Sequence, residues 1–339
     1  MNEKNQNIKS ETQKEEFTLP QLLHVSPAPH IKSLDTTRAL MLDVIIALLP
    51  ALLWGVFSFG WRALVVVLIS VASSVLFEGL FQRLTKRTLM ITDLSSVVTG
   101  LILGLSLPPR VSFWVPIAGA FFAIVIAKQL FGGIGKNLVN PALAGRVFLS
   151  LCWPEEMIRF VNPETDVISY ATPLLSLKER TIPDSSIFDY VLGSYAGAIG
   201  EVSALALAIG GVYLLIRRVI TWHVPVAFLG TAAVLFFFFP RVEGENLNFA
   251  LFSIFTGSLL FCAIFAANDF STTPVTNGGR LLFGVGCGLI TVFIRYFGAY
   301  PEGAAYAVLI MNLFVPLLER CTVPVRFGMR REKKGKHTL

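Results

Sequence analysis

A short polar stretch interrupts a chain that is otherwise strongly apolar. It reads DVISYATPLLSLKER, residues 166–180, and it places the hydroxyl groups of Ser169, Tyr170 and Thr172 close together. A threonine hydroxyl is a weak nucleophile unless another group activates it, so covalent chemistry at Thr172 would require a second enzyme. The plainer interpretation is an exposed turn rich in serine and threonine. Which interpretation holds depends on where the rest of the chain positions this stretch.

The composition places the stretch in an integral membrane protein. Hydrophobic residues make up 54% and charged residues 15% of the 339 residues, and the mean hydropathy is +0.67. A helix that crosses a bilayer needs about twenty apolar residues, so the chain has room for about ten spans. Residues 1–36 are polar and contain no signal-peptide pattern, so we expect them to form a cytoplasmic tail.

Hydropathy and helix-breaking residues divide the apolar region into ten segments. These are Thr37–Phe57, Leu64–Phe81, Leu94–Leu107, Phe113–Leu130, Pro141–Trp153, Ala196–Ile216, Val224–Phe239, Phe249–Ala267, Leu281–Phe297 and Gly303–Leu318. The third segment is short and is closed by Pro108, and the fifth is short and opens with Pro141, a residue suited to the first turn of a helix. Interrupted helices occur at membrane depth where they line a cavity or lie inside the protein. The expected fold is an all-α polytopic membrane protein with broken or half helices.

Two parts of the sequence resemble each other and predict an internal repeat. SSVVTGLILGLSLPP in the first half aligns with FSIFTGSLLFCAIFA in the second, so that Thr99-Gly100 matches Thr256-Gly257. With five spans in each half, the two repeats would have opposite orientations in the membrane, an architecture common in transport proteins. The predicted organisation is a first repeat (37–153), a loop (154–195), a second repeat (196–320) and a basic tail (321–339).

Lysine and arginine residues predict the orientation, because cytoplasmic loops carry an excess of them. In the ten-span arrangement the richer side holds Lys4, Lys9, Lys14, Arg83, Lys86, Arg87, Lys128, Lys136, Arg217, Arg218, Arg280, Arg330, Arg331, Lys333, Lys334 and Lys336. Both termini are therefore expected in the cytoplasm and the loop 154–195 outside it. The net charge of +6 then reflects topology, and it requires no nucleic-acid partner.

Ionisable side chains beside apolar segments are a second group of candidates, because charges at membrane depth are costly and often functional. Glu201 is either an ion or proton site or a carboxylate at the lipid interface, favoured by a helix N-terminus. Asp269 either binds a cation near a helix end or caps a turn. Arg146 lies inside the short fifth segment, where it would pair with an anionic group, a carboxylate or the C-terminus of a helix.

The motif formed by Asp166, Ser169, Ala171 and Thr172, D-x-x-S-x-A-T, resembles the flavinylation motif of the NqrB/RnfD family of membrane subunits. In that family a dedicated flavin transferase joins FMN through its phosphate to the threonine of the motif, on the extracytoplasmic face. The resemblance therefore implies covalent FMN on Thr172. Tyr170 stands where the family commonly has glycine, and its ring could pack against a flavin.

The resemblance extends over nearly the whole chain. It includes SPAPHIKS, AKQLFGGIGKNLVNPALAGRVF, GAIGEVSALALAIGGVYLL, AANDFSTTPVTNGGR and PEGAAYAVLIMNLFVPLLE, in the order found in the family, and the short N-terminus is more similar to the RnfD members. It implies ten transmembrane helices related by a pseudo-twofold axis, as in urea channels. It also implies a complex in the cell membrane that moves electrons between ferredoxin and NAD while it translocates Na⁺ or H⁺. The implied partners are a second flavinylated subunit, the ferredoxin- and NAD-handling subunits, and the flavin transferase.

The resemblance also suggests roles for further residues. Arg146 could answer a flavin phosphate, and Asn137 and Asn140 could satisfy backbone groups or contact a second, noncovalent flavin such as riboflavin. Asp269 and Glu201 are the candidate residues of the ion pathway. Two other functions stay open, namely an NqrB-like subunit of a Na⁺-translocating NADH:quinone oxidoreductase and a urea-channel-like transporter without a redox role.

Other cofactor chemistry has no support in the sequence. The four histidines are dispersed, the four cysteines are isolated among apolar residues, and no Rossmann fingerprint or iron–sulfur cysteine set is present. The run GGIGKNLVNPA lacks the spacing of a phosphate-binding loop. Oxidation of ferredoxin or of NADH is therefore assigned to other subunits, and this chain alone is not a complete enzyme.

Overall fold

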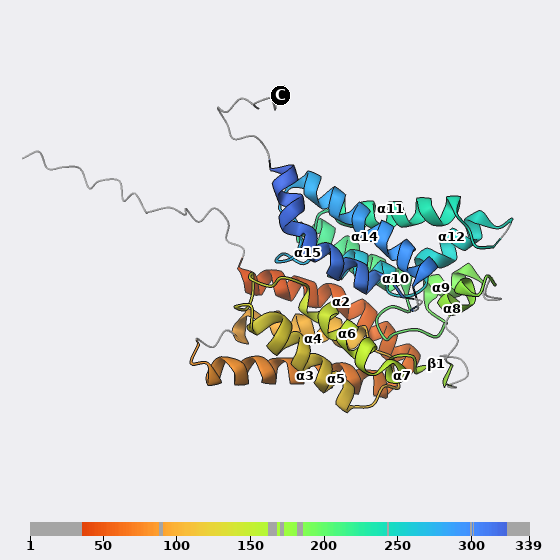
Figure 1. Cartoon of the computed structure of the whole chain (residues 1–339). Coiled ribbons are helices and arrows are strands. Elements are labelled where there is room, and N and C mark those ends of the chain that lie inside the picture. The colour runs from red at the N-terminus through yellow and green to blue at the C-terminus, as the bar shows by residue number, and fades with distance from the viewer. Residues whose placement is uncertain are drawn as a thin grey trace, which may run out of the picture. The chain divides into compact units, whose positions relative to one another are not determined.

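The computed structural model describes residues 36–87, 91–161, 168–169, 173–181, 186–242, 244–298, 300 and 302–323. These residues are mainly helical, and the only strands among them form a two-residue antiparallel ladder of β1 (Phe160–Val161) and β2 (Ile168–Ser169). The longer helices run side by side, and α7, α8, α9 and β1 gather at one end of them (Figure 1).

The helices follow the predicted order along the chain. The first half contains α2 (Thr37–Phe59), α3 (Trp61–Leu84), η1 (Ile91–Asp93), α4 (Ser95–Leu105), α5 (Trp114–Phe121), the π-helix η2 (Phe122–Gln129) and α6 (Pro141–Cys152). The connecting region contains α7 (Pro154–Met157), α8 (Pro173–Lys178) and α9 (Ile187–Leu192). The second half contains α10 (Ala204–Ile216), α11 (His223–Phe238), α12 (Asn246–Phe255), α13 (Leu259–Phe261), the π-helix η3 (Cys262–Ala266), α14 (Asn277–Phe297) and α15 (Ala304–Thr322).

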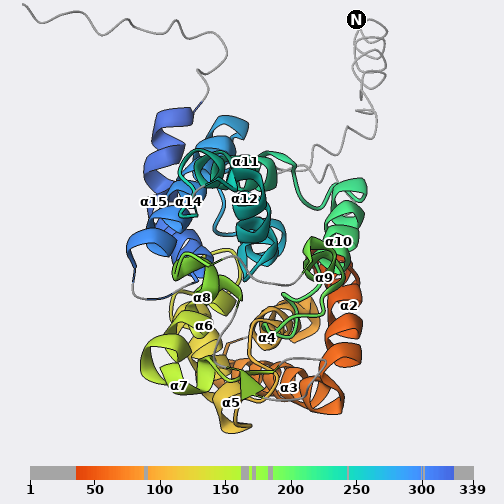
Figure 2. The ribbon, with the colours of Figure 1, turned by 90° about the vertical axis from the view of Figure 1, so that its right-hand side faces the viewer.

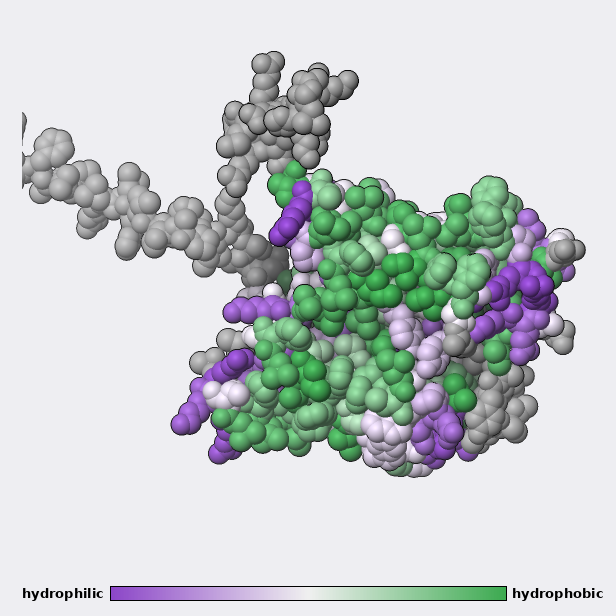
Figure 3. Space-filling model, in the orientation of Figure 1, coloured by the Kyte–Doolittle hydropathy of each residue, from purple (hydrophilic) through white to green (hydrophobic). Residues whose placement is uncertain are grey.

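Several helices have the length and composition of membrane spans. Among the described residues, α2, α3, α14 and α15 each qualify alone, and Asn246–Phe255 with Leu259–Ala266 qualifies as one bent pair. The helices α4, α6, α10, α11 and the continuous pair α5–η2 are apolar but shorter. Figure 3 shows a broad hydrophobic belt, with hydrophilic patches at both ends. Large apolar side chains such as Leu53, Phe57 and Phe293 are exposed, as expected where lipid covers the surface.

Local sequence explains the two short helices that were predicted. Leu94 adopts a left-handed conformation (φ 58°) just before α4, and the prolines at positions 108 and 109 prevent the helix from continuing. The oxygen of the Asn140 side chain accepts hydrogen bonds from the backbone N–H groups of Ala142 and Leu143, and Pro141 occupies the first turn of α6. The end of α4 and the start of α6 are therefore fixed by residues that lie next to them in the sequence.

The eighth predicted segment is broken, which the sequence interpretation did not anticipate. The helix α12 ends at Phe255, Gly257 adopts φ +71°, and the second part of the pair turns by 63°. Arg295 satisfies the carbonyls that the break frees by donating to the oxygens of Ser253 and Thr256, the latter at 3.2 Å. The hydroxyl of Tyr195 donates to the oxygen of Phe255 at 3.1 Å. These bonds explain how an interrupted backbone is tolerated inside the protein.

The matched Thr-Gly pairs therefore differ in backbone conformation. Thr99 and Gly100 lie within the helix α4, whereas Thr256 and Gly257 form the break between α12 and α13.

Close packing joins the first helices of the two halves. An added Cβ at Gly210 of α10 would lie 2.1 Å from the backbone oxygen of Ala47 in α2, so only glycine permits this approach. Asp43 of α2 accepts hydrogen bonds from Tyr213 at 2.8 Å and from Arg217 at 3.1 Å. Figure 2 shows α2 beside α10.

The sixth segment is helical only from Ala204, later than the predicted start at Ala196. The preceding turn is bonded to the end of α4, because Ile199 and Gly200 donate their N–H groups to the oxygens of Leu107 and Leu105 at 3.1 and 2.7 Å. These bonds supply partners to the last carbonyls of α4. They also hold the next residue, Glu201, in the interior.

Candidate functional site

A buried arginine links the two halves of the chain. Arg146 of α6 is 4% exposed, and its two terminal nitrogens form salt bridges with Glu201, before α10, and with Glu302, before α15. Of the three interpretations of Arg146, the structure supports pairing with carboxylates. Both terminal nitrogens are already engaged, so a flavin phosphate would have to compete with two carboxylates for this side chain.

Glu201 is 2% exposed and has one unpartnered oxygen. Its Oε1 receives the bond from Arg146, whereas its Oε2 has no hydrogen-bond partner among the described residues. A buried carboxylate with a free acceptor has the chemistry of a proton or cation ligand.

Most of the predicted flavinylation motif lies outside the described residues. Asp166, Tyr170, Ala171 and Thr172 belong to that part, and only the backbone of Ser169 is described, paired with Phe160 across the β1–β2 ladder. Pro173, which directly follows Thr172, begins α8 and lines a small pocket together with Glu201 and Glu302. The residue that follows the motif therefore lies beside the group formed by Arg146, Glu201 and Glu302, which we call the Arg146 cluster.

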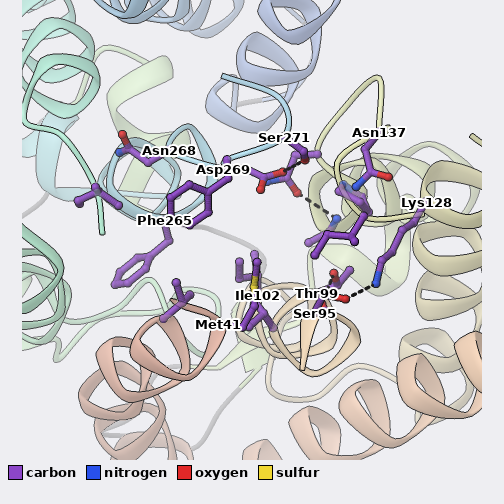
Figure 4. A pocket seen from close by; sticks show the side chains of 18 of the residues that line it. Met41, Ser95, Thr99, Ile102, Lys128, Asn137, Phe265, Asn268, Asp269 and Ser271 are labelled. Atoms are coloured by element: carbon purple, nitrogen blue, oxygen red, sulfur yellow. Dashed lines mark hydrogen bonds between the residues drawn. The ribbon is translucent and has the colours of Figure 1, made fainter. Parts of the chain in front are cut away.

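A second pocket lies near the opposite ends of the helices, where residues of both halves meet. It is a cavity of about 70 Å³, and its walls come from α2, α4, the residues around the N-terminus of α6 and the segment after η3. Lys128 and Ser95 lie on one side of it, and Asp269 lies across from them (Figure 4). The hydroxyl of Ser271 donates to Asp269 at 3.0 Å.

Lys128 is buried, in contrast to the cytoplasmic loop cation that the sequence interpretation assumed. It is 2% exposed, and its Nζ donates to Glu78 Oε2 at 2.9 Å and to Ser95 Oγ at 2.7 Å. Gln129 donates to Glu78 Oε1 at 2.8 Å. An ion pair buried in this way persists because each charge has several partners.

Asn137, Asn140 and Asp269, which the sequence singled out, all line this pocket. They differ in whether their polar side-chain atoms already have hydrogen-bond partners. Asn140 uses its oxygen to cap α6 and its nitrogen to donate to Ala266 O at 3.1 Å. Asp269 accepts from Ser271 and Thr272, which organises the turn after η3. The oxygen of the Asn137 side chain is buried and has no partner among the described residues. Asn137 is therefore the residue whose polar atom is free to meet a ligand.

Sequence reasoning missed several of these residues. Glu302 and Glu78 are acidic residues in or beside apolar segments, so the rule that selected Glu201 would have selected them as well. No sequence signal pairs either one with its partner, because Glu302 and Arg146 are 156 positions apart. Tyr195 also gave no signal, although its hydroxyl donates to the backbone oxygens of Glu201 and Phe255.

Metal and disulfide chemistry find no support in the described part of the chain. No group of three or more metal-binding side chains occurs there. The four cysteines are unpaired, with Cys262 and Cys287 buried and Cys152 and Cys321 exposed.

The helices and the buried ionic clusters define a mostly helical, polytopic membrane protein. Residues 24–328 match the NQR2, RnfD, RnfE family, and the chain belongs to this family.

Comparison with individual members shows similarity over almost the full length. The chain is 42% identical to the D subunit of the Na(+)-translocating ferredoxin:NAD(+) oxidoreductase complex of Acetobacterium woodii, covering 92% of this chain and 97% of the relative. It is 36% identical to the D subunit of the proton-translocating ferredoxin:NAD(+) oxidoreductase complex of Clostridium ljungdahlii, covering 91% and 96%. It is 33% identical to the D subunit of the ion-translocating oxidoreductase complex of Escherichia coli, covering 91% and 99%.

Proposed function

We propose that this chain is the D subunit of an Rnf-type ion-translocating ferredoxin:NAD⁺ oxidoreductase complex in the cell membrane. The observation that carries the proposal is the 42% identity with a protein of that name over 92% of the chain. The relatives compared above are all named as the D subunit of an ion-translocating oxidoreductase complex, which favours the Rnf type over a quinone-reducing NqrB and over a channel without redox chemistry.

The proposal includes FMN attached through its phosphate to Thr172. A bound flavin would accept and donate electrons, and the protein would supply placement and electrostatics. Pro173 supports this assignment, because the residue next to Thr172 lines a pocket shared with Glu201 and Glu302. The lining fits a tethered aromatic group, because Phe160 lines this pocket and also an adjoining pocket that contains Tyr300 and Tyr306.

We also propose ten spans with both termini in the cytoplasm. Counting the bent pair as one span and α5–η2 as another gives five spans before residue 153 and five after residue 196. The first spans of each half, α2 and α10, pack together through Asp43 and Arg217, and the fifth spans, α6 and α15, meet near Arg146 and Glu302. Contacts between equivalent elements are what a pseudo-twofold axis would produce.

The pocket of Figure 4 is our candidate for a second, noncovalent flavin. It is mostly apolar, with a few polar groups that converge on it from different segments, as small-molecule sites usually are. Asn137 would orient the ligand through its free oxygen, while Asn140 would act indirectly by holding the start of α6.

The candidate ion pathway runs between these two regions. Asp269 lies at the pocket of Figure 4, and Glu201 lies at the Arg146 cluster, toward the connecting region that contains α8. Each carboxylate is accessible to a pocket, which a Na⁺ or H⁺ ligand requires. Either ion fits the oxygen ligands present, and the named relatives include one Na⁺-translocating and one proton-translocating complex.

The first experiment is in-gel flavin fluorescence of the denatured protein after coexpression with a flavin transferase. Wild type and Ser176→Ala, a control that removes another hydroxyl from this region, are expected to fluoresce, and Thr172→Ala is expected to be dark. A dark wild type, with the transferase shown to be active on another substrate, would overturn the flavin assignment.

A further inference from the structure

Three basic residues from distant parts of the chain line one small pocket. Lys178 ends α8, Arg241 follows α11, and Arg295 lies near the end of α14. The cavity has a volume of about 20 Å³, and its other walls come from Leu174, Leu177, Phe236, Phe249, Ser253 and Tyr296. No acidic side chain occurs among the described residues that line it. The pocket therefore presents positive charge from three separate segments.

In the described part of the chain, the two arginines of this pocket bond to backbone oxygens and not to carboxylates. Arg241 donates to the oxygens of Lys178, at 3.2 Å, and of Tyr296. Arg295 donates to the carbonyls at the break after α12, and its Nε has no hydrogen-bond partner among the described residues. Arg295 is 5% exposed, and a buried donor without a partner is costly. An anionic oxygen in the pocket would supply both the missing acceptor and the missing negative charge.

The size of the cavity limits what can enter it. A cavity of about 10–15 Å³ holds one water molecule, so a cavity of about 20 Å³ admits one oxygen-sized group. Lys178, Arg241 and Tyr296 are partly exposed, so the pocket reaches the surface of the protein. This arrangement fits a phosphate group that inserts one oxygen, while the molecule that carries it stays outside.

The surroundings of the pocket indicate the level of lipid headgroups. The helices α11 and α14 end beside it, where Phe238, Phe239 and Phe297 are large exposed aromatic residues. The hydroxyl of Tyr296 donates to the oxygen of Phe239 at 2.6 Å. Aromatic residues gather at the two interfaces of a membrane protein. The helices α8 and α12 lie at the same end of the molecule (Figure 1), where hydrophilic residues border the hydrophobic belt (Figure 3).

We propose that this pocket binds the phosphate group of an anionic phospholipid. One phosphate oxygen would lie in the cavity beside Arg295, and Lys178 and Arg241 would contact the other oxygens at its mouth. Basic pockets between transmembrane helices bind such headgroups in other membrane proteins. The bound lipid would bridge α8, α12 and the end of α14. The inference does not depend on a flavin, because none of these residues belongs to the flavinylation motif.

The test is thermal unfolding of the full-length chain, purified in a neutral detergent and stripped of lipid, during titration with phosphatidylglycerol or phosphatidylcholine. Both lipids contain a phosphate, and phosphatidylglycerol alone carries a net negative charge. A ligand that binds the folded protein raises its unfolding midpoint. We expect phosphatidylglycerol to act at a lower mole fraction than phosphatidylcholine, and this difference to shrink at high salt. Inorganic phosphate should have no comparable effect, because it lacks the acyl chains that hold the headgroup at the surface.

Two variants test the pocket itself. Lys178→Gln and Arg241→Gln each remove one charge from its mouth and spare Arg295, which satisfies the backbone at the break. Each should weaken the apparent affinity for phosphatidylglycerol about fivefold, the factor that corresponds to about 1 kcal/mol per basic residue near a membrane surface. Arg180→Gln is the matched control, because Arg180 is an exposed basic residue just after α8 and lies outside the lining. It should bind phosphatidylglycerol as wild type does.

Each variant is compared with its own midpoint in phosphatidylcholine, so that a less stable variant does not mimic weaker binding. Wild-type affinity in both Lys178→Gln and Arg241→Gln would overturn the pocket as the site, and so would an equal loss in Arg180→Gln. Equal effects of the two lipids on wild type would overturn the selection of an anionic headgroup. An equal effect of inorganic phosphate would overturn the lipid as the occupant.

Discussion

Arg146 of α6 and Glu302, which lies just before α15, form a salt bridge that joins the two halves of the chain. Arg146 simultaneously pairs with Glu201, so one cation satisfies two acidic residues from two connecting turns. This arrangement ties the start of α15 and the turn before α10 to α6. It places Glu201 Oε2, a buried oxygen without a hydrogen-bond partner among the described residues, beside the pocket that Pro173 lines.

Replacement of Arg146 is expected to be strongly destabilising. Arg146→Met leaves the buried carboxylate of Glu201 and the partly buried carboxylate of Glu302 without this partner, and removal of one member of a buried pair costs about 3–5 kcal/mol. Thermal unfolding of the detergent-solubilised protein should show a large drop in midpoint. As a control, Arg159→Met removes a partly exposed pair with Glu156 at 2.9 Å, which should cost about 1 kcal/mol or less. An equal drop of the unfolding midpoint in the Arg146 and Arg159 variants would contradict this role for Arg146.

The Lys128–Glu78 pair should behave as a coupled unit. Lys128→Met alone leaves Glu78 buried and charged, so we expect a loss of about 3–5 kcal/mol. The double variant Lys128→Met/Glu78→Gln removes both charges and should recover most of that loss, because the two residues contact each other directly. Unfolding midpoints of the two single variants and the double variant measure the coupling. Additive losses would show that the two charges act independently.

Gly257 is expected to be intolerant of a side chain. Its φ of +71° costs an L-residue about 1–2 kcal/mol, so Gly257→Ala should lower the unfolding midpoint. Gly230 lies within α11 with open space around its Cβ position. Gly230→Ala should therefore stabilise the helix by about 0.5–1 kcal/mol. If both variants shifted the unfolding midpoint in the same direction, the left-handed conformation of Gly257 would be contradicted.

Asn140 should contribute to stability through the start of α6. Asn140→Ala removes the acceptor for two backbone N–H groups and the donor to Ala266 O, and loss of a helix cap costs about 0.5–2 kcal/mol. Asn140→Asp retains the cap, so its unfolding midpoint should lie between those of Asn140→Ala and wild type. Asn248→Ala, which breaks only an exposed bond to Glu245, is the matched control and should unfold like wild type.

The second-flavin assignment can be tested through Asn137. Asn137→Ala should weaken binding of added riboflavin to the purified protein, because the free oxygen in the pocket is lost, by about tenfold for a bond worth ~1.5 kcal/mol. Fluorescence titration in detergent measures the affinity. Lys136→Ala, an exposed neighbour outside the pocket lining, should bind riboflavin as wild type does. Equal affinity of the Asn137 variant and wild type would remove this residue from the site.

Apolar segment length and breaker residues predicted much of the helix order. The start of α6 at Pro141 and the end of α4 before Pro108 follow from chain-local rules, since a proline limits the helix that contains it. The break at Gly257 was not predicted, because FTGSLLF remains mostly apolar and a single glycine is tolerated in many membrane helices. Its cause is distant in sequence, since Arg295 supplies the hydrogen bonds that satisfy the backbone at the break.

Composition and short motifs were enough to establish a membrane protein, the order of its apolar segments and the D-x-x-S-x-A-T stretch ending at Thr172, because these are local properties of the chain. The burial of Lys128 against Glu78, and the pairing of Arg146 with both Glu201 and Glu302, became visible only in the folded molecule. Ion pairs between residues so far apart depend on which helices pack together. That packing is a sum of many weak contacts across the whole fold, which no local pattern encodes.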